Sequence, residues 1–467
     1  MATSAYKDDL SDWLFQESTR TYERTGTYSY GVTFKTRQIP REVVVARAKE
    51  AVGRFRFRAP IVACSRKIDQ ELPLQQSFVY KPALNAEEAL AWAATSLTIE
   101  TVKGVTLEKY LAEQAEKAFP YIHPNGLEQF FGCFLLCHDQ EDVYSFVARI
   151  AHGFVDGRPW LNFLRFVLDT IASPDKEKEV RQLEWGSEWS NLPDSPATLA
   201  RRNVKRQSSH NYNGNYDLVW EEGWRELQTK LQKVFNRMEL GESLKPPKPE
   251  ATGKRPMARA THQIDAATIN LIKSELKMLG HSMAILVPAV HILTVFQRSQ
   301  PLKPESYITL DLTMIDTSRF FPPEYSGPLI ASSRTGFAPL TVEAKEIVWN
   351  ASTREQLICI MKNLEKQVQD YLQYPQLTLI NTVGPTESSV APMHPHTCIL
   401  SYIGVIDLIL PSTIISKESG DVELEVLDFG VTHRHAGGFQ RPSNILWCFR
   451  GKFNIMIQVN ICPLLSM

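Results

Sequence analysis

The sequence has no surplus of charge of either sign. Its 467 residues include 51 lysine and arginine residues and 52 aspartate and glutamate residues, so the net charge is −1. Without a basic surplus, a protein has no strong electrostatic attraction for nucleic acid or for an anionic membrane surface. We therefore expect neither of them as a partner.

Long hydrophobic runs are also missing. The most apolar long window, Met283 to Phe296, is too short to cross a bilayer and contains His291, so it predicts a buried helix and no membrane span. The N-terminus lacks a basic segment followed by an apolar one, and therefore gives no secretory signal. The seven cysteines are scattered and odd in number, which suits reduced thiols better than disulfides. Together these features predict a cytoplasmic protein.

Internal repeats and low-complexity tracts are absent, and 43% of the residues are hydrophobic. A chain of this length and composition can form two or three domains with cores of their own. Proline and glycine cluster between Gly241 and Gly253, which marks a boundary. We predict an N-terminal lobe over 1–215, a helix and proline-rich linker over 216–257, and a C-terminal lobe over 258–467.

Both lobes show apolar residues at strand spacing and at helix spacing. In the N-terminal lobe these patterns predict strands over 28–36, 129–138 and 143–152 and helices over 40–55, 84–95, 107–118 and 161–171. In the rest of the chain they predict helices over 218–238, 266–279 and 283–297 and strands over 259–264, 307–314, 377–383, 399–406, 422–429 and 453–461. The expected fold class is mixed α/β, with two similar lobes that each contain a mixed β-sheet flanked by helices.

One segment combines residue types that chemistry requires: His152-Gly-Phe-Val-Asp156-Gly157. It follows a predicted strand and precedes a helix that we expect to begin near Pro159. A histidine at the end of a strand can expose its ring in a cleft and accept a proton from a hydroxyl or amine at neutral pH. Asp156 can fix the turn by pairing with an arginine or with backbone N–H groups, so its expected role is structural. Gly157 permits a tight turn.

The histidine-to-aspartate spacing alone is a weak signal. The same spacing occurs at His138 and Asp142, where valine rather than glycine follows. The glycine after Asp156, together with the strand before it and the helix after it, distinguishes the second match from the first. The alternative interpretation is that His152 is a turn histidine with no chemical role.

The region from Val143 to Ile171 resembles the His-x-x-x-Asp-Gly region of the chloramphenicol acetyltransferase-like superfamily. This superfamily includes plant acyl-CoA-dependent alcohol acyltransferases and the condensation domains of nonribosomal peptide synthesis. Three further segments resemble its Gly-x-(Ser/Thr) turn, its Ser-Asn-x-Gly strand and its last long strand, in that order: 279–290, 400–407 and 449–460. Within the superfamily, the sequence resembles fungal secondary-metabolite O-acetyltransferases of the trichothecene 15-O-acetyltransferase type.

The resemblance implies an acyltransferase. In the family, the histidine removes a proton from an acceptor hydroxyl or amine, which attacks a thioester carbonyl and releases a thiol. By this resemblance His152 is the general base, Asp156 is structural, and Gly157 lets the loop close. Acyl-CoA is the expected co-substrate and a small natural product the expected acceptor, with no bound cofactor and no metal. A tunnel between the lobes would hold both substrates, so we expect a monomer.

Five further residues are candidates for lining this tunnel by the same resemblance: Ser401, Tyr402, Gly404, Asp428 and Phe429. The sequence departs from the family near them. Tyr402 stands in place of asparagine, and Asp428-Phe-Gly matches only the first three residues of the plant motif Asp-Phe-Gly-Trp-Gly. In addition, Ala151 stands where condensation domains carry a second histidine. These departures keep two alternatives open: a CoA-independent cyclase of natural-product biosynthesis on the same fold, and a non-catalytic binding protein.

Other patterns are interpreted as structural. His394-Pro-His396 and His433-Arg-His435 have the spacing of metal-ligand pairs, but no carboxylate or cysteine follows at a recognised spacing, so no metal site is predicted. Cys133 and Cys137 share one face of a predicted strand, which indicates buried thiols. The basic run from Arg201 to Arg206 indicates a solvated linker, with contact to CoA phosphates as the alternative.

Overall fold

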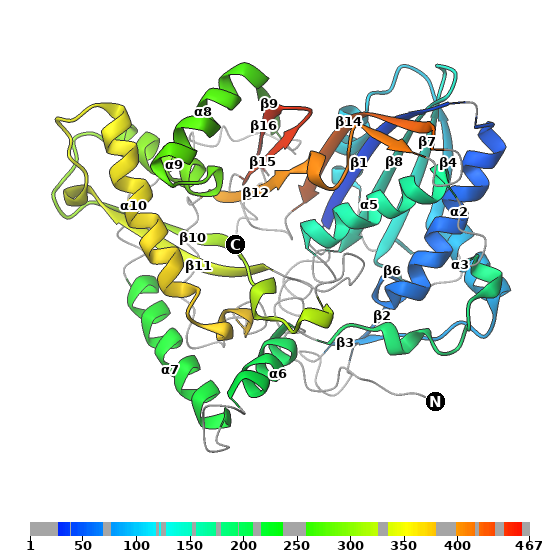
Figure 1. The fold of residues 1–467 in the computed structure, drawn as a ribbon, viewed down its shortest axis with the longest axis horizontal. Helices are drawn as coiled ribbons and strands as arrows, with labels where there is room; N and C mark the ends of the chain where they lie inside the picture. The colour runs from blue at the N-terminus through cyan, green and yellow to red at the C-terminus, as the bar shows by residue number, and fades with distance from the viewer. Residues whose placement is uncertain are drawn as a thin grey trace, which may run out of the picture. The chain divides into compact units, whose positions relative to one another are not determined.

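A computed structural model of the chain divides into two compact units, whose elements are labelled in Figure 1. Unit 1 contains Met1–Ser195, Pro323–Ser333 and Ile406–Gly437, and unit 2 contains Pro196–Pro322, Arg334–Val405 and Gly438–Met467. The structure describes residues 27–37, 39–68, 76–117, 121–122, 128–151, 156–173, 179–194, 196–208, 216–236, 258–325, 335–379, 398–415, 420–434 and 443–459.

Unit 1 is built on a six-stranded sheet with the order β13-β14-β1-β8-β7-β4. Neighbouring strands are antiparallel except β4 and β7, which are parallel. The strands are β1 (Thr27–Thr36), β4 (Leu97–Val102), β7 (Phe131–His138), β8 (Val143–Ala151), β13 (Thr413–Ile415) and β14 (Val422–Arg434). Two short pairs accompany this sheet: β2 (Ser65–Ile68) with β3 (Gln76–Val79), and β5 (Tyr121–Ile122) with β6 (Glu128–Gln129).

Strands β13 and β14 come from the C-terminal half of the chain but belong to the sheet of unit 1. β14 pairs with β1 along the whole of β1, from Thr27 opposite Arg434 to Thr36 opposite Leu424. Residues 406–437, which the sequence placed in the C-terminal lobe, thus complete the N-terminal sheet, and unit 2 already begins at Pro196. The difference arises because β1 would otherwise be an open edge, and local periodicity does not say which strand covers an edge.

Helices lie on both faces of the unit 1 sheet; α2, α3 and α5 are labelled in Figure 1. Three of them lie on one face and one on the other: α2 (Arg41–Arg58), α3 (Ala86–Ser96) and α5 (Gly157–Ala172), opposed by α4 (Leu107–Glu116). Successive residues of β8 separate these faces, because side chains alternate along a strand. Phe146 contacts Phe163 of α5, whereas Val147 packs with Leu107 of α4.

Two glycines allow α4 to lie close to the sheet. Gly31 of β1 and Gly430 of β14 are directly opposite each other in the strand register. A Cβ atom on Gly31 would lie 2.5 Å from Leu107 Cδ1, and one on Gly430 would lie 2.6 Å from Leu111 Cδ1. Both leucine side chains are buried. The glycine of Asp428-Phe-Gly430 therefore makes room for a helix.

Gly430→Ala is expected to lower the free energy of unfolding by about 1–3 kcal/mol, because the added methyl group has to displace the buried Leu111 side chain. Urea unfolding measures this change. The double variant Gly430→Ala/Leu111→Ala is the control, since it removes the obstructing atoms. Its cost is expected to be smaller than the sum of the two single costs. Additive costs would contradict this packing.

In the described part of unit 2, the strands form two sheets: one with the order β12-β15-β16-β9, and the pair β10-β11. The strands are β9 (Ala258–Ile264), β10 (Tyr307–Asp316), β11 (Thr335–Glu343), β12 (Ile399–Val405), β15 (Ser443–Phe449) and β16 (Lys452–Val459). The helices are α6 (Pro196–Ser208), α7 (Tyr216–Phe235), α8 (Ala266–Leu279), α9 (Met283–Arg298) and α10 (Thr353–Tyr371). A buried cluster joins α7, α9 and α10 to β10 and β11 and includes Leu227, Phe296, Leu340 and Leu364.

The most apolar of the described helices, α9, is a core helix, as the sequence predicts. Ile292, Leu293 and Phe296 are buried in it. Among the described helices, none is by itself long and apolar enough to cross a membrane; α8 and α9 pass that test only as a pair, with a bend of 100° between them.

Most predicted elements are confirmed within a few residues. α8 has the predicted bounds, and it ends at Gly280, which has a left-handed φ of 74°. The strand predicted over 377–383 is wrong at its start, because Pro375–Leu379 form a 3-10 helix, and residues 380–383 lie outside the described part of the chain. The sequence patterns did not predict β2, β3, β4, β5, β11, β13, β15, α6 or α10.

Candidate active site

The structure describes both sides of the predicted catalytic segment. β8 is a central strand between β1 and β7 and ends at Ala151. α5 begins at Gly157, two residues earlier than the sequence predicted from Pro159. His152 is the first of the four residues 152–155 that lie outside the described part of the chain, so its role as the base stays a prediction.

Asp156 is the N-cap residue of α5, with φ −94° and ψ −176°. Its side chain is only 5% exposed, which is unusual for an aspartate. A negative charge at this position interacts favourably with the positive end of the helix dipole. The carboxylate does not cap α5 with a hydrogen bond, and its interactions are made elsewhere in the structure. The structural role of Asp156 stays a prediction.

Aromatic side chains fix α5 to the sheet directly after its first turn. Trp160 is 1% exposed, and its Nε1 donates a hydrogen bond to the Ala148 carbonyl oxygen at 3.3 Å. The ring of Phe163 lies 4.9 Å from that of Trp160 and 4.2 Å from that of Phe55 in α2. A site placed between a central strand and such a helix has rigid supports at both ends.

A row of aromatic residues lies on the α5 face of β1 and β14. The ring centroids of Tyr28 and Tyr30 are 6.0 Å apart, that of His433 is 5.6 Å from Tyr28, and that of Phe429 is 6.0 Å from Tyr30. Burial, and then the nearby charge of Asp156, raise the pKa of Tyr28, and burial also raises the pKa of Tyr30. Both phenols are therefore neutral groups beside the buried carboxylate. The sequence patterns did not single out either tyrosine.

Asp428, a predicted tunnel residue, lies on the other face of β14 from Phe429. It is exposed, its Oδ1 accepts a hydrogen bond from the Phe429 backbone N–H at 2.8 Å, and it lies opposite Thr33 of β1. Partial desolvation raises the pKa of its carboxyl group, as does the charge of Glu108 in α4, against the lowering effect of that hydrogen bond. Phe429 thus belongs to the aromatic row, and Asp428 does not.

The other tunnel candidates, Ser401, Tyr402 and Gly404, lie in β12 of unit 2. Tyr402 packs with a hydrophobic cluster, 6.2 Å from the Phe453 ring between centroids, and burial raises its pKa. Gly404 has φ 104° and lies where the register of β12 with β15 shifts, a conformation that favours glycine. These features explain the segment by packing and strand geometry. The tunnel itself stays a prediction.

His138, the histidine of the weaker motif match, has a structural partner. Its Nε2 lies 2.8 Å from Ser145 Oγ, which is 2.8 Å from Thr33 Oγ1, so the three side chains form a chain across β7, β8 and β1. Desolvation lowers the pKa of His138, against the opposite effect of Asp139. Because its Nε2 is hydrogen-bonded to the buried Ser145, His138 has a structural role within the sheet.

The remaining motifs have structural surroundings where they are described. Cys133 and Cys137 are buried in β7, as predicted, and burial raises the pKa of both thiols. The interpretation of residues 201–206 as a linker is wrong, because they lie in α6. Arg201 forms an ion pair with Asp217 of α7, with 2.5 Å between Nη2 and Oδ1. No group of three potential metal ligands occurs among the described residues. His394, His396 and His435 lie outside that part of the chain.

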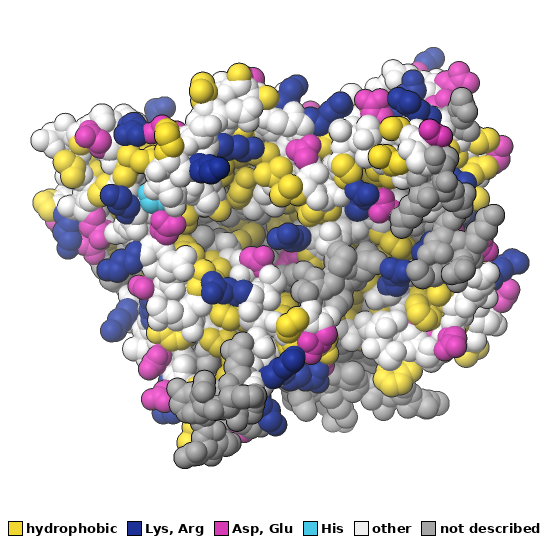
Figure 2. All heavy atoms as spheres, viewed as in Figure 1, with side chains coloured by type: hydrophobic (Ala, Val, Ile, Leu, Met, Phe, Trp, Pro, Cys, Tyr) yellow, Lys and Arg dark blue, Asp and Glu magenta, His cyan; other side chains and the backbone are white. Residues whose placement is uncertain are grey.

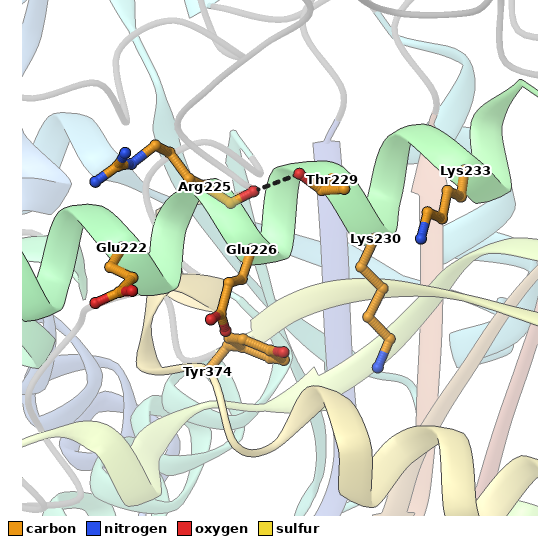
Figure 3. A pocket seen from close by; sticks show the side chains of 7 residues that line it. All are labelled: Glu222, Arg225, Glu226, Thr229, Lys230, Lys233 and Tyr374. Carbon is orange, nitrogen blue, oxygen red and sulfur yellow. Dashed lines mark hydrogen bonds between the residues drawn. The ribbon is translucent and has the colours of Figure 1, made fainter.

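Charges of both signs are interspersed on the face of the molecule shown in Figure 2. The same mixture lines a depression of about 440 Å³ along α7 (Figure 3), whose lining residues are Glu222, Arg225, Glu226, Thr229, Lys230, Lys233 and Tyr374. Lys230 lies 4.4 Å above the Tyr371 ring and 3.9 Å from Asp370 of α10, and desolvation lowers its pKa. These contacts join α7 to α10, and the mixed charges indicate no particular ligand.

No protein-family model and no curated protein sequence matches the chain. Solved structures do match it. A trichothecene 15-O-acetyltransferase from Fusarium sporotrichioides has a TM-score of 0.74 and 14% identity, over 97% of this chain and 90% of its own. The condensation domain of the monacolin K polyketide synthase has a TM-score of 0.57 and 12% identity, over 97% and 91%. The X-domain from teicoplanin biosynthesis has a TM-score of 0.57 and 12% identity, over 98% of this chain and 91% of its own. The chain therefore has the chloramphenicol acetyltransferase-like fold of these proteins, as the sequence resemblance implied.

Proposed function

We propose that the chain is an acyltransferase that moves an acyl group from acyl-CoA to a hydroxyl or amine of a small natural product. The observation that carries this proposal is the placement of the motif: Asp156 and Gly157 begin a buried helix, and His152 follows directly on the last residue of the central strand β8. The fold supports the proposal, since the similar structures include an acetyltransferase and a condensation domain.

His152 is the general base of the proposed reaction. Its imidazole takes the proton of the acceptor group while the oxygen or nitrogen attacks the thioester carbonyl. The new C–O or C–N bond forms, the C–S bond breaks, and the leaving sulfur receives the proton from the imidazolium, so that free CoA is released. Asp156 positions the start of α5 and does not transfer a proton. Acyl-CoA is a co-substrate, and the reaction needs no bound cofactor.

Release of free CoA tests the proposal. The purified protein is incubated with acetyl-CoA or longer acyl-CoAs and a mixture of complex alcohols and amines, and CoA is detected by mass spectrometry. This readout avoids thiol reagents, which the seven cysteines of the chain would consume. We expect CoA release that depends on one acceptor. No release from any donor, by a protein with a normal thermal unfolding transition, would contradict acyl transfer from CoA. Conversion of an acceptor without CoA would instead favour a cyclase.

A further inference from the structure

Tyr30 is a buried residue at the centre of the β1 aromatic row. Its side chain is 2% exposed and lies between the rings of Tyr28 and Phe429, each 6.0 Å away between centroids. Stacking on both sides restricts the ring, because an interior packed to this density leaves little room for another rotamer. The hydroxyl is therefore held at a defined height above the sheet.

That hydroxyl lies against the first residue of α5. A Cβ atom on Gly157 would be 2.6 Å from Tyr30 Oη and 3.6 Å from Tyr30 Cζ. The first distance is shorter than a carbon–oxygen contact allows, whereas the second is an ordinary van der Waals contact. Among the described residues, the phenol oxygen alone therefore requires glycine at position 157. The glycine of the motif is fixed by one atom of a strand far from it in the sequence.

Asp156 lies beside the same group. Its charge acts on both Tyr28 and Tyr30, and it is itself buried as the N-cap of α5. A neutral hydroxyl close to a buried carboxylate and to the positive end of a helix restrains both of them. Tyr30 thus contacts Gly157 at the helix start and lies near enough to Asp156 for that carboxylate to raise its pKa.

We infer that Tyr30 is a positioning residue, whose hydroxyl sets where α5 begins, at the described end of the motif that carries His152. The inference rests on the proposed function for the role of His152. The contact between Tyr30 and Gly157 rests on the described residues alone. Position 157 needs a glycine because the Tyr30 hydroxyl occupies the space of a Cβ atom, and not because a loop has to be flexible there.

Three variants test the inference: Tyr30→Phe, Gly157→Ala and the double variant. Gly157→Ala is expected to lower Tm by about 4 °C or more, because its methyl group meets the phenol oxygen. In the double variant the nearest ring atom is 3.6 Å away, and alanine favours a helix more than glycine does. We therefore expect its Tm to return at least to that of Tyr30→Phe. The matched control, Tyr28→Phe combined with Gly157→Ala, removes the neighbouring hydroxyl and is expected to give no rescue.

Kinetics separate positioning from mere stability. Tyr30→Phe is expected to lower kcat for CoA release about 10-fold with little change in KM for acyl-CoA, since a displaced base impairs the transition state and not the binding of the donor. A Tm rescue with wild-type kcat in Tyr30→Phe would show a structural contact only and overturn the inference. A double variant no more stable than Gly157→Ala would overturn the contact. If the folded wild type releases no CoA, the proposed function fails, and the positioning role fails with it, while the Tm rescue still reports on the contact.

Discussion

His152→Ala is expected to lower kcat for CoA release by about 10²–10⁴-fold, the usual contribution of a general base. Without the imidazole, the acceptor has to lose its proton to water, and the leaving sulfur has no positioned donor. Substrate binding involves other groups, so KM is expected to change much less than kcat. Acceptor-dependent CoA release, followed by mass spectrometry in single-turnover and steady-state form, measures both quantities.

His138→Gln is the matched control for this variant. His138 has the same spacing to an aspartate, but its ring nitrogen is engaged with Ser145 in the sheet, and glutamine can keep a polar partner there. We expect kcat close to that of the wild type. Retention of most activity in His152→Ala, or an equal loss in His138→Gln, would contradict the assignment of His152 as the base.

Removing the Glu188 carboxylate is expected to produce the largest loss of stability, about 3–5 kcal/mol for Glu188→Ala. The residue is 0% exposed, and its carboxylate accepts hydrogen bonds from the Tyr80 hydroxyl at 2.8 Å and from the backbone N–H groups of Ala83 and Gly186, both at 2.7 Å. Each buried donor that loses its acceptor costs about 1–3 kcal/mol. These bonds fix the segment before α3 to the segment that follows α5.

Urea unfolding of two further variants makes this prediction specific. Glu188→Gln keeps the shape of the side chain but turns an NH2 group towards a hydrogen-bond donor. We therefore expect the free energy of unfolding to fall by about 1–3 kcal/mol. Glu184→Ala, at an exposed acid four residues earlier, is expected to stay within about 0.5 kcal/mol of the wild type. A Glu188→Gln variant as stable as the wild type would mean that the carboxylate network contributes little.

Elements with strong local signals could be predicted from the sequence. The hairpin of β7 and β8 has two largely apolar strands joined by a polar turn, and α3 begins after a capping residue, Asn85, whose side chain accepts a hydrogen bond from the Glu88 backbone N–H. α10 has a comparable local signal, which the apolar spacing did not reveal: Ser352 and Glu355 form a capping box at its start. In these cases the determinants lie within a few residues of each other.

The rest depends on pairing between distant segments. The strand pattern at 422–429 was found, but nothing local indicates that β14 runs on to Arg434 or that its partner is β1. The same holds for the site. The motif around Asp156 is visible in the sequence, whereas Tyr30 acquires its relation to Gly157 only through the register of β1 with β8 and the packing of α5. Side-chain contacts across such distances leave no periodic trace in one sequence.

The pairing of β14 with β1 also bears on how the protein is made. On the ribosome, β1, β8 and β7 emerge long before β14, so the nascent N-terminal sheet has β1 as an exposed, hydrogen-bonding edge while unit 2 is still being translated. Such an edge invites pairing with other chains, and long-range pairing is slow to form. Unit 1 is therefore completed only after β14 has been synthesised, which follows most of unit 2, and the β1 edge stays open to other chains until then.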